Sequence, residues 1–308
     1  MSDYKHFLKV DFIILMFIHK AIYSVMKAHQ PIFILGAPRS GTTWLGKTFE
    51  QHPDIDCWYE NNAVWTWGNS RKADDVLTEQ NLNPKISQYI QKRFSEFSDK
   101  SNKKYIIDKT PRNCLRIPFI HAIFPEAKII MLLRDGRSVI NSTNNELKKP
   151  KKVPWEEIKI RLKNLSIWEV HTLIPRLAPR IKSMMGIKLD YWGARPPGWN
   201  NWIGNYSPPA LLAKQWAATM NIAIKEGRKL PPEKYIEVKY EDLVNYPQNE
   251  LIKLTNFLEI ENPQPIIDFA KNSCDPERIS KWKSSLDQNI LDEIEEIMKS
   301  TMALIGYS

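Results

Sequence analysis

The sequence predicts an α/β fold, a three-layer sandwich in which a central parallel sheet carries helices on both faces. Short aliphatic segments have the composition of buried strands, and helical patterns separate them. Strands that alternate with helices imply a parallel sheet covered on both sides. The length of 308 residues, 43% of them hydrophobic, suits one large domain, so we expect a single domain over residues 1–308. The expected strands are Ile32 to Leu35, Tyr105 to Ile107, Lys128 to Leu133 and Tyr235 to Val238.

Residues 1–29 are predicted to form an apolar helix. The uninterrupted apolar stretch, Phe12 to Ile18, is shorter than the roughly 20 residues that cross a bilayer. No small-residue cleavage site follows it. We expect this helix to pack on the domain, and peripheral membrane contact through it is the alternative.

The first expected strand leads into the segment PIFILGAPRSGTTWL, Pro31 to Leu45. A glycine-containing loop between a strand and a helix directs backbone N–H groups and the positive helix end at one small volume. The spacing from Gly36 to Gly41 matches the nucleotide-triphosphate loop GxxxxGK[ST], but Thr42 holds the lysine position. Arg39 supplies a positive charge instead. The loop therefore predicts a phosphate-like ligand that is not necessarily a nucleoside triphosphate with magnesium.

A second anion site is predicted in the segment KIIMLLRDGRSVINS, Lys128 to Ser142. Arg134 follows a strand, and Ser142 lies about two turns into the next helix. An arginine fork and a small hydroxyl suit a phosphate. Taken alone, the pattern equally fits a helix-start ion pair between Arg134 and Asp135.

Residues 147–207 are rich in proline and tryptophan. The part from Ile158 to Leu173 could be a helix. We interpret the whole stretch as an insertion that shapes the acceptor site, and an irregular packed excursion is the alternative. The tryptophans considered for acceptor binding are Trp192, Trp199 and Trp202.

The formal net charge of +9 favours anionic partners. Nucleic acid is not expected, because no block of basic residues is interleaved with aromatics. The cysteines, Cys57, Cys114 and Cys274, are odd in number and widely spaced, which predicts neither a metal-ligand pair nor a disulfide framework. A reducing compartment, and hence a cytoplasmic protein, is the expectation from this pattern.

The segments PRSGTTWL and LLRDGRSVINS together closely resemble the sulfotransferase family that uses 3′-phosphoadenosine 5′-phosphosulfate (PAPS). The resemblance implies that the first loop holds the 5′-phosphosulfate and that Arg134 and Ser142 hold the 3′-phosphate. Two anion sites at neighbouring strand ends suit a ligand phosphorylated at both ends. The residues that the resemblance places on the 5′ side are Arg39, Ser40, Gly41, Thr42 and Thr43.

Two further segments, and Trp44 within the first loop segment, match the family. Tyr240, in the segment KYEDL, is a candidate for adenine contact or a packed aromatic residue. Trp44 stands where the cytosolic branch has a tryptophan against adenine, although burial in the core explains it equally. The run Ser280-Lys281-Trp282-Lys283 resembles the C-terminal segment that contacts the 3′-phosphate, which implicates Ser280 and either Lys281 or Lys283.

The expected catalytic base is Glu60. The cytosolic branch uses a histidine in a K-x-H run, but this chain reads Asp108-Lys109-Thr110-Pro111 there. His121 is better explained as a core or surface residue. The spacing from Arg39 to Glu60 resembles the branches that act on tyrosyl proteins and glycans with a glutamate base. The alternative is an exposed glutamate that caps a helix from Asn61.

The resemblance therefore predicts transfer of a sulfuryl group from PAPS to a hydroxyl or amine by in-line displacement. Glu60 would accept the proton, and Lys109, Arg39 and the loop amides would stabilise the leaving oxygen. No metal is expected, and Asp108 is the nearest carboxylate at which magnesium could bind. The expected acceptor is a small molecule, a glycan or a lipid. A P-loop small-molecule kinase and a non-catalytic nucleotide-binding module are the alternatives.

Overall fold

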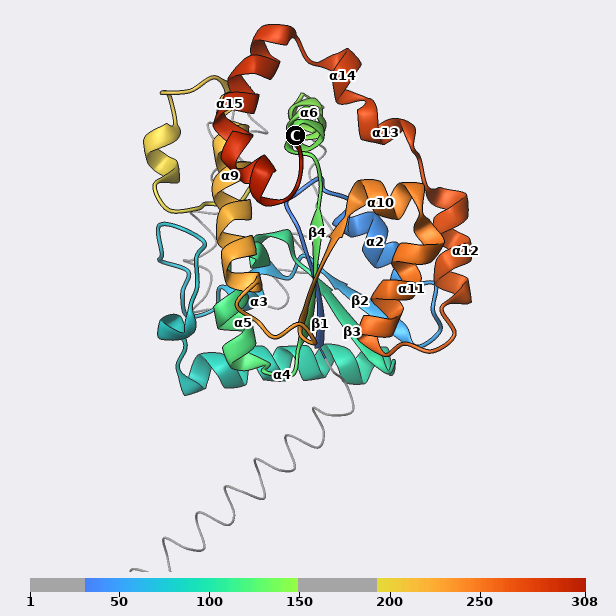
Figure 1. Cartoon of the computed structure of the whole chain (residues 1–308). Helices are drawn as coiled ribbons and strands as arrows, with labels where there is room; N and C mark the ends of the chain where they lie inside the picture. The colour runs from blue at the N-terminus through green and yellow to red at the C-terminus, as the bar shows by residue number, and fades with distance from the viewer. Residues whose placement is uncertain (1–30, 149–192) are drawn as a thin grey trace, which may run out of the picture.

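The computed structural model describes residues 31–148 and 193–308, and its strands form one parallel sheet in the order β2-β3-β1-β4-β5 (Figure 1). The strands are β1 (Pro31–Leu35), β2 (Ile55–Tyr59), β3 (Tyr105–Lys109), β4 (Lys128–Leu133) and β5 (Tyr235–Lys239). The predicted α/β class with a parallel sheet is confirmed, and each of the four expected strands is present. The segment directly before Glu60, which is not among the expected strands, forms the edge strand β2.

The central strand β1 explains why both faces of the sheet are covered. Phe33 and Leu35 point into one hydrophobic core, while Ile32 and Ile34 point into another. Successive side chains of a strand alternate between faces, so a run of aliphatic residues requires apolar neighbours on both sides. All five residues of β1 are buried.

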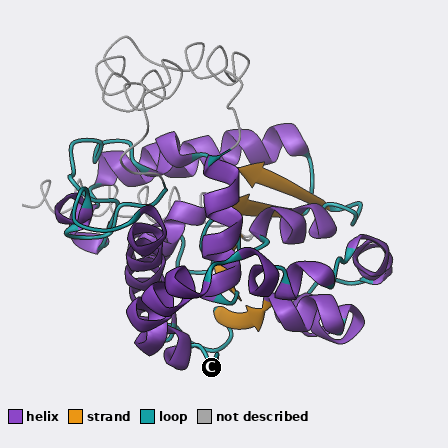
Figure 2. Ribbon diagram, turned by 90° about the horizontal axis from the view of Figure 1, so that it is seen from above, coloured by secondary structure: helices purple, strands orange, loops and turns teal. Residues whose placement is uncertain are grey.

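Helices from different parts of the chain cover the two faces (Figures 1 and 2). The face with Phe33 carries α3 (Asn62–Trp65), α4 (Pro84–Ser101), α5 (Ile117–Ile123), α6 (Gly136–Leu147), α9 (Pro208–Gly227) and α15 (Gln288–Leu304). The face with Ile34 carries α2 (Thr42–Phe49), α10 (Tyr240–Asn245), α11 (Pro247–Leu258) and α12 (Gln264–Ser273). The short elements are α13 (Glu277–Ser280), α14 (Trp282–Ser285), η1 (Glu79–Asn81), η2 (Pro111–Leu115) and η4 (Trp199–Trp202).

The longer helices begin at residues that the sequence marks clearly. The Asn83 side chain accepts a hydrogen bond from the Ile86 backbone N–H at the start of α4, directly before Pro84. Ser207 does the same for Ala210 before α9. A side-chain oxygen before a helix satisfies an N–H that has no partner inside the helix, and proline at the first position costs no hydrogen bond.

The strand register brings the functional loops to one edge of the sheet. Tyr59 pairs with Lys109, and Leu35 pairs with Met131. The chain therefore leaves β1, β2, β3 and β4 at the same carboxyl edge, which is where parallel sheets bind ligands.

Two predictions fall outside the described residues. The N-terminal helix over residues 1–29 lies there, as does most of the 147–207 insertion, including the Ile158 to Leu173 helix and Trp192. Within the described ranges, no helix has both the length and the apolar character needed to cross a membrane. The domain boundaries therefore stay predictions.

The described end of the insertion packs against the loop before η1. Trp199 Nε1 donates to the carbonyl oxygen of Ala73 at 2.8 Å. The Arg195 backbone N–H donates to Asp75 at 2.9 Å, and its guanidinium forms an ion pair with the same carboxylate at 2.9 Å. Asp75 therefore fixes this end of the insertion to the core.

Candidate active site

The conformation of the loop between β1 and α2 strongly favours glycine at position 41. Gly41 has φ 101°, in the left-handed region, and a Cβ atom there would lie 2.6 Å from Tyr240 Cδ2. Glycine adopts this conformation without steric cost and leaves room for the tyrosine ring. Arg39, two residues earlier, also has a positive φ of 72°. The loop is thus held in an unusual conformation beneath Tyr240.

The start of α2 provides groups suited to an anion. Ser40 is only 1% exposed, and its Oγ has no hydrogen-bond partner within the described residues. The first N–H groups of a helix have no partner inside that helix, and its N-terminal end carries partial positive charge. A buried hydroxyl without a partner costs free energy unless a ligand or water satisfies it. These features fit a phosphate-like group at the loop.

Arg134 lies at the end of β4 and joins this loop to the C-terminal segment. Its Nη1 donates to the Arg39 carbonyl oxygen and its Nη2 to the Arg278 carbonyl oxygen, both at 2.9 Å. The guanidinium lies 4.1 Å from the centre of the Tyr240 ring. Its Nε is buried without a partner among the described groups. Burial lowers the pKa of Arg134, which still remains a cation at neutral pH.

A cavity of about 540 Å³ connects the loop with Arg134 and with one face of α6. Most of the predicted nucleotide-binding residues line it. These are Arg39, Gly41, Thr42, Thr43, Trp44, Arg134, Ser142, Tyr240 and Lys281. Ser40 lies buried in the loop, whereas Ser280 and Lys283 are not among the lining residues. A contact of those two side chains with a nucleotide stays a prediction.

Two aromatic side chains form one wall of this cavity. Trp44 Nε1 donates to Ser273 Oγ at 3.0 Å, and its ring meets the Tyr240 ring edge to face at 6.2 Å. Tyr240 is buried between Arg134 and Gly41. Both rings therefore have a packing role in the wall, and their contact with an adenine base stays a prediction.

Sequence reasoning missed several residues of the cavity. Ser138, Asn141 and Asn145 line it together with Ser142, at the spacing that places side chains on one helix face. That polar face could have been recognised once Ser142 was chosen. Five more residues of the lining have no recognisable signal in the sequence: Glu146, Ser273, Cys274, Asp275 and Arg278.

Glu60 and Lys109 meet at the ends of the neighbouring strands β2 and β3. Lys109 Nζ lies 2.8 Å from Glu60 Oε1, and the Glu60 backbone N–H donates to the Lys109 carbonyl oxygen at 2.9 Å. The lysine side chain is 2% exposed, whereas that of Glu60 is 66% exposed. Glu60 thus contacts the buried lysine, and Asn61, not Glu60, stands at the start of α3.

The Glu60 backbone is strained. Its φ is 54°, a left-handed conformation that costs a non-glycine residue roughly 1–2 kcal/mol. Such outliers persist where the surroundings impose them and cluster at functional sites. With the backbone in this conformation, the Glu60 carboxylate lies against Lys109 at the carboxyl edge of the sheet.

Asp108, next to Lys109, has a structural role. It is fully buried and accepts hydrogen bonds from Trp65 Nε1, Thr110 Oγ1 and Asn113 Nδ2 at 3.0, 3.3 and 3.1 Å. Burial raises the pKa of Asp108 to about 7, even though these donors oppose the shift. Within the described ranges, no three His, Cys, Asp or Glu residues gather in a way that could hold a metal ion.

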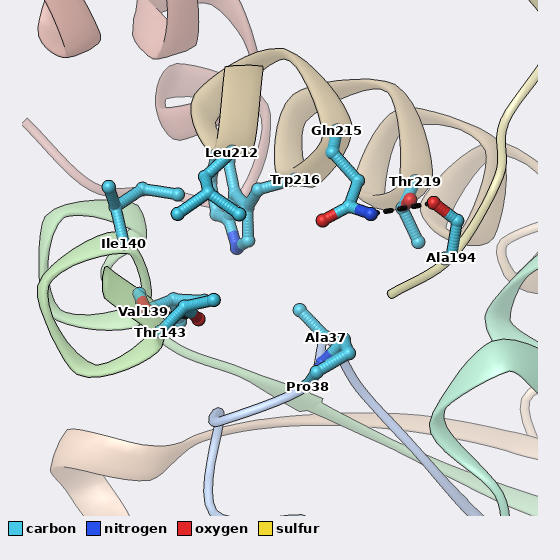
Figure 3. A pocket seen from close by; sticks show the side chains of 10 residues that line it. All are labelled: Ala37, Pro38, Val139, Ile140, Thr143, Ala194, Leu212, Gln215, Trp216 and Thr219. Carbon is cyan, nitrogen blue, oxygen red and sulfur yellow. Dashed lines mark hydrogen bonds between the residues drawn. The ribbon is translucent and has the colours of Figure 1, made fainter. Parts of the chain in front are cut away.

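A second cavity, of about 20 Å³, is lined in part by Ala37 and Pro38 and has room for about one water molecule (Figure 3). It lies between the loop, α6 and α9, and Gln215 crosses its wall to donate to the Ala194 carbonyl oxygen at 2.7 Å. This small space is a packing gap beneath the loop. Its lining residues are Ala37, Pro38, Val139, Ile140, Thr143, Ala194, Leu212, Gln215, Trp216 and Thr219.

The model of the Sulfotransferase family matches residues 31–174 and 174–264, which hold both predicted anion-binding segments as well as Glu60 and Lys109. The chain belongs to the sulfotransferase family. It is therefore an enzyme that transfers a sulfuryl group, and the kinase and non-catalytic alternatives are not favoured.

Relatives and solved structures agree with this assignment. A Caenorhabditis briggsae protein described as a protein-tyrosine sulfotransferase is 21% identical, over 90% of this chain and 89% of its own length. The Drosophila melanogaster protein-tyrosine sulfotransferase is 26% identical over 94% of this chain, but the match spans only 54% of that relative. The match to a Caenorhabditis elegans relative, protein-tyrosine sulfotransferase A, spans 50% of the length of that relative. This chain thus spans about half the length of two of these relatives.

The solved structures support the fold. The sulfotransferase domain from the curacin biosynthetic pathway has a TM-score of 0.56 and 19% identity, with 91% of this chain and 98% of that chain covered. Sulfotransferase STF9 from Mycobacterium avium has a TM-score of 0.52 and 11% identity, with 94% of this chain and 81% of that chain covered.

The expected cytoplasmic location is wrong. The relatives that are protein-tyrosine sulfotransferases contradict it. The expectation rested on the unpaired cysteines, but Cys57 and Cys114 are buried in the core. Burial raises the pKa of the Cys114 thiol to about 12. Buried thiols of this kind react poorly, so the unpaired state of Cys57 and Cys114 does not identify the compartment.

Proposed function

We propose that this sulfotransferase takes the sulfuryl group from PAPS, held along the cavity of about 540 Å³. The observation that supports this is the continuity of the cavity between two anion sites, the loop at the start of α2 and the pair Arg134 and Ser142. An adenosine phosphorylated at both ends has an anionic group for each site. When bound, PAPS would supply the sulfuryl group, and adenosine 3′,5′-bisphosphate would be the leaving group.

Each end of the cavity has groups that would hold one anion. Ser40 Oγ and the N–H groups of Gly41, Thr42 and Thr43 would bind the 5′ end, with Arg39 as the cation of the loop. Arg134 Nε and Ser142 Oγ would bind the ribose phosphate, and Lys281 adds a positive charge to the same cavity. The Tyr240 and Trp44 rings would lie against the base.

Glu60 is proposed as the base and Lys109 as its partner. Glu60 would take the proton of the acceptor hydroxyl as that oxygen attacks sulfur. Lys109, 2.8 Å away, holds the Glu60 carboxylate in place before the reaction and offers a buried positive charge to the oxygen that leaves. The large exposure of the Glu60 side chain supports the approach of an acceptor from solvent.

The acceptor is proposed to be a hydroxyl group on a protein or a small molecule. The named relatives act on tyrosine in proteins, so a tyrosine phenol is the first acceptor to test. The earlier expectation of a small molecule, a glycan or a lipid contained no protein acceptor. We expect incubation with labelled PAPS to transfer label to a tyrosine peptide or to a small phenol, but not to the matching phenylalanine peptide. Absence of transfer to every hydroxyl acceptor in such a panel would contradict the proposed reaction.

Replacing Arg134 with alanine tests the nucleotide assignment. Loss of a charged hydrogen bond should weaken adenosine 3′,5′-bisphosphate binding by about tenfold to a hundredfold and adenosine 5′-phosphate binding much less. Isothermal titration calorimetry measures both, and Arg93→Ala, on the exposed side of α4, is the matched control. Equal losses of affinity for the two nucleotides would contradict the assignment of the 3′-phosphate to Arg134.

A further inference from the structure

A carboxylate of α6 lies in the cavity that we assign to the nucleotide. Glu146 lines this cavity one helical turn after Ser142. Its Oε2 is 3.7 Å from Arg39 Nη2, and Arg39 Nε donates to Ser142 Oγ at 3.2 Å. The Arg39 guanidinium therefore reaches from the loop across to α6, where it meets both the hydroxyl and the carboxylate.

The charges of the cavity make this carboxylate unusual. The lining residues include four cations, Arg39, Arg134, Arg278 and Lys281, and two carboxylates. Asp275 is bound by Arg278 at 2.8 Å, at the C-terminal wall. Glu146 instead faces the cation of the phosphate-binding loop itself. A fixed negative charge in a site for a polyanion opposes that ligand.

We propose that Glu146 sets the affinity and selectivity of the nucleotide site by competing with the ligand for Arg39 and by opposing a phosphate at Ser142. This inference rests on the proposed use of PAPS. Arg39 exchanges Glu146 for an anionic oxygen of the nucleotide when the nucleotide binds. The side chains of both residues are about two-fifths exposed, so their ion pair is weak and the exchange is easy.

Glu146 should weaken the binding of adenosine 3′,5′-bisphosphate more than that of adenosine 5′-phosphate. Competition for Arg39 weakens the binding of any nucleotide with an anionic 5′ group. Repulsion at Ser142 acts only on a nucleotide with a ribose phosphate, because Ser142 and Glu146 are neighbours on the same face of α6. Glu146 therefore lowers the preference for the 3′-phosphorylated nucleotide.

The substitution Glu146→Gln tests this directly. We expect adenosine 3′,5′-bisphosphate to bind about threefold to tenfold more tightly, with a smaller gain for adenosine 5′-phosphate, and both gains to shrink at high salt. Calorimetry measures the dissociation constants, and thermal unfolding shows that the variant is folded. The control is Glu96→Gln, which removes the same charge from an exposed Arg93–Glu96 pair on α4. Unchanged or weaker binding, or a gain matched by the control, would overturn the proposal.

A second comparison isolates the competition for Arg39. In an Arg39→Met background, Glu146→Gln should give no gain for adenosine 5′-phosphate, because the contested cation is gone. A gain as large as that in the unchanged protein would overturn the competition. Failure of the proposed function would look different, since the unchanged protein would then show no preference for adenosine 3′,5′-bisphosphate over adenosine 5′-phosphate.

Discussion

Replacing Glu60 with glutamine is expected to lower kcat by about 10²- to 10⁴-fold and to leave the binding of adenosine 3′,5′-bisphosphate unchanged. Glutamine has nearly the same size and keeps a carbonyl oxygen that can accept the Lys109 hydrogen bond. It cannot accept a proton from an acceptor hydroxyl. Glu60 is outside the lining of the nucleotide cavity, so binding and turnover should separate.

The measurement is steady-state sulfate transfer together with calorimetry of the nucleotide. Glu50→Gln is the matched control. The Glu50 carboxylate also contacts β2, where it accepts a hydrogen bond from the Tyr59 hydroxyl at 2.6 Å. That variant should turn over near the level of the unchanged protein. Near-normal turnover of Glu60→Gln would show that Glu60 is not the catalytic base.

The strained backbone of Glu60 offers an independent check. Asparagine tolerates the left-handed conformation better than glutamate does, so Glu60→Asn should fold at least as stably apart from the lost ion pair. Its side-chain amide cannot accept a proton, so sulfuryl transfer should be lost as in Glu60→Gln. A variant that loses activity while it keeps its melting temperature places Glu60 in the reaction and not in the fold.

The sequence predicted the sheet well because buried parallel strands leave an unambiguous pattern. Each central strand is a short aliphatic run bounded by turn residues, as Ile32 to Leu35 is. The edge strand β2 was harder to recognise, because Asp56 interrupts its apolar run. Helix starts followed from local caps such as Asn83.

The candidate site was only partly predictable, because its residues converge in space. Family resemblance implicated Glu60 and Lys109, but neither the left-handed backbone of Glu60 nor the 2.8 Å ion pair has a signature in the sequence. The same holds for Arg39, whose side chain reaches α6 and not only its own loop. Such contacts depend on register and rotamers, which no local pattern encodes.

Asp75 is the clearest example of a residue that is important for the structure but that no sequence pattern marks. Its side chain is 1% exposed and lies among three arginines, Arg112, Arg116 and Arg195, at 3.8, 3.7 and 2.9 Å. Arg116 Nη1 also donates to Asn62 Oδ1 at 2.8 Å, two residues after Glu60. The carboxylate thus links the described end of the insertion to the segment that carries the proposed base.

Replacing Asp75 with asparagine is expected to lower the free energy of unfolding by about 3–5 kcal/mol, because it leaves buried cationic charge without its carboxylate. Urea unfolding measures the loss. Asp99→Asn, on the exposed side of α4, is the control and should change stability by less than about 0.5 kcal/mol. A loss for Asp75→Asn no larger than that of the control would show that the arginines are satisfied without it.

The free energy of unfolding that is lost in Asp75→Asn should also depend on pH in a defined direction. Burial alone would raise the pKa of Asp75, but the three arginines together hold it below its usual value of 3.8. The folded state therefore binds this proton less readily than the unfolded chain. The stabilisation is fully present above about pH 4 and is lost as the pH falls through the lower pKa of the folded state. The stability gap between the unchanged protein and Asp75→Asn should accordingly stay constant near neutral pH and narrow in acid. A gap that widens in acid would mean that the carboxyl is protonated in the folded protein and that the arginines do not stabilise its charge.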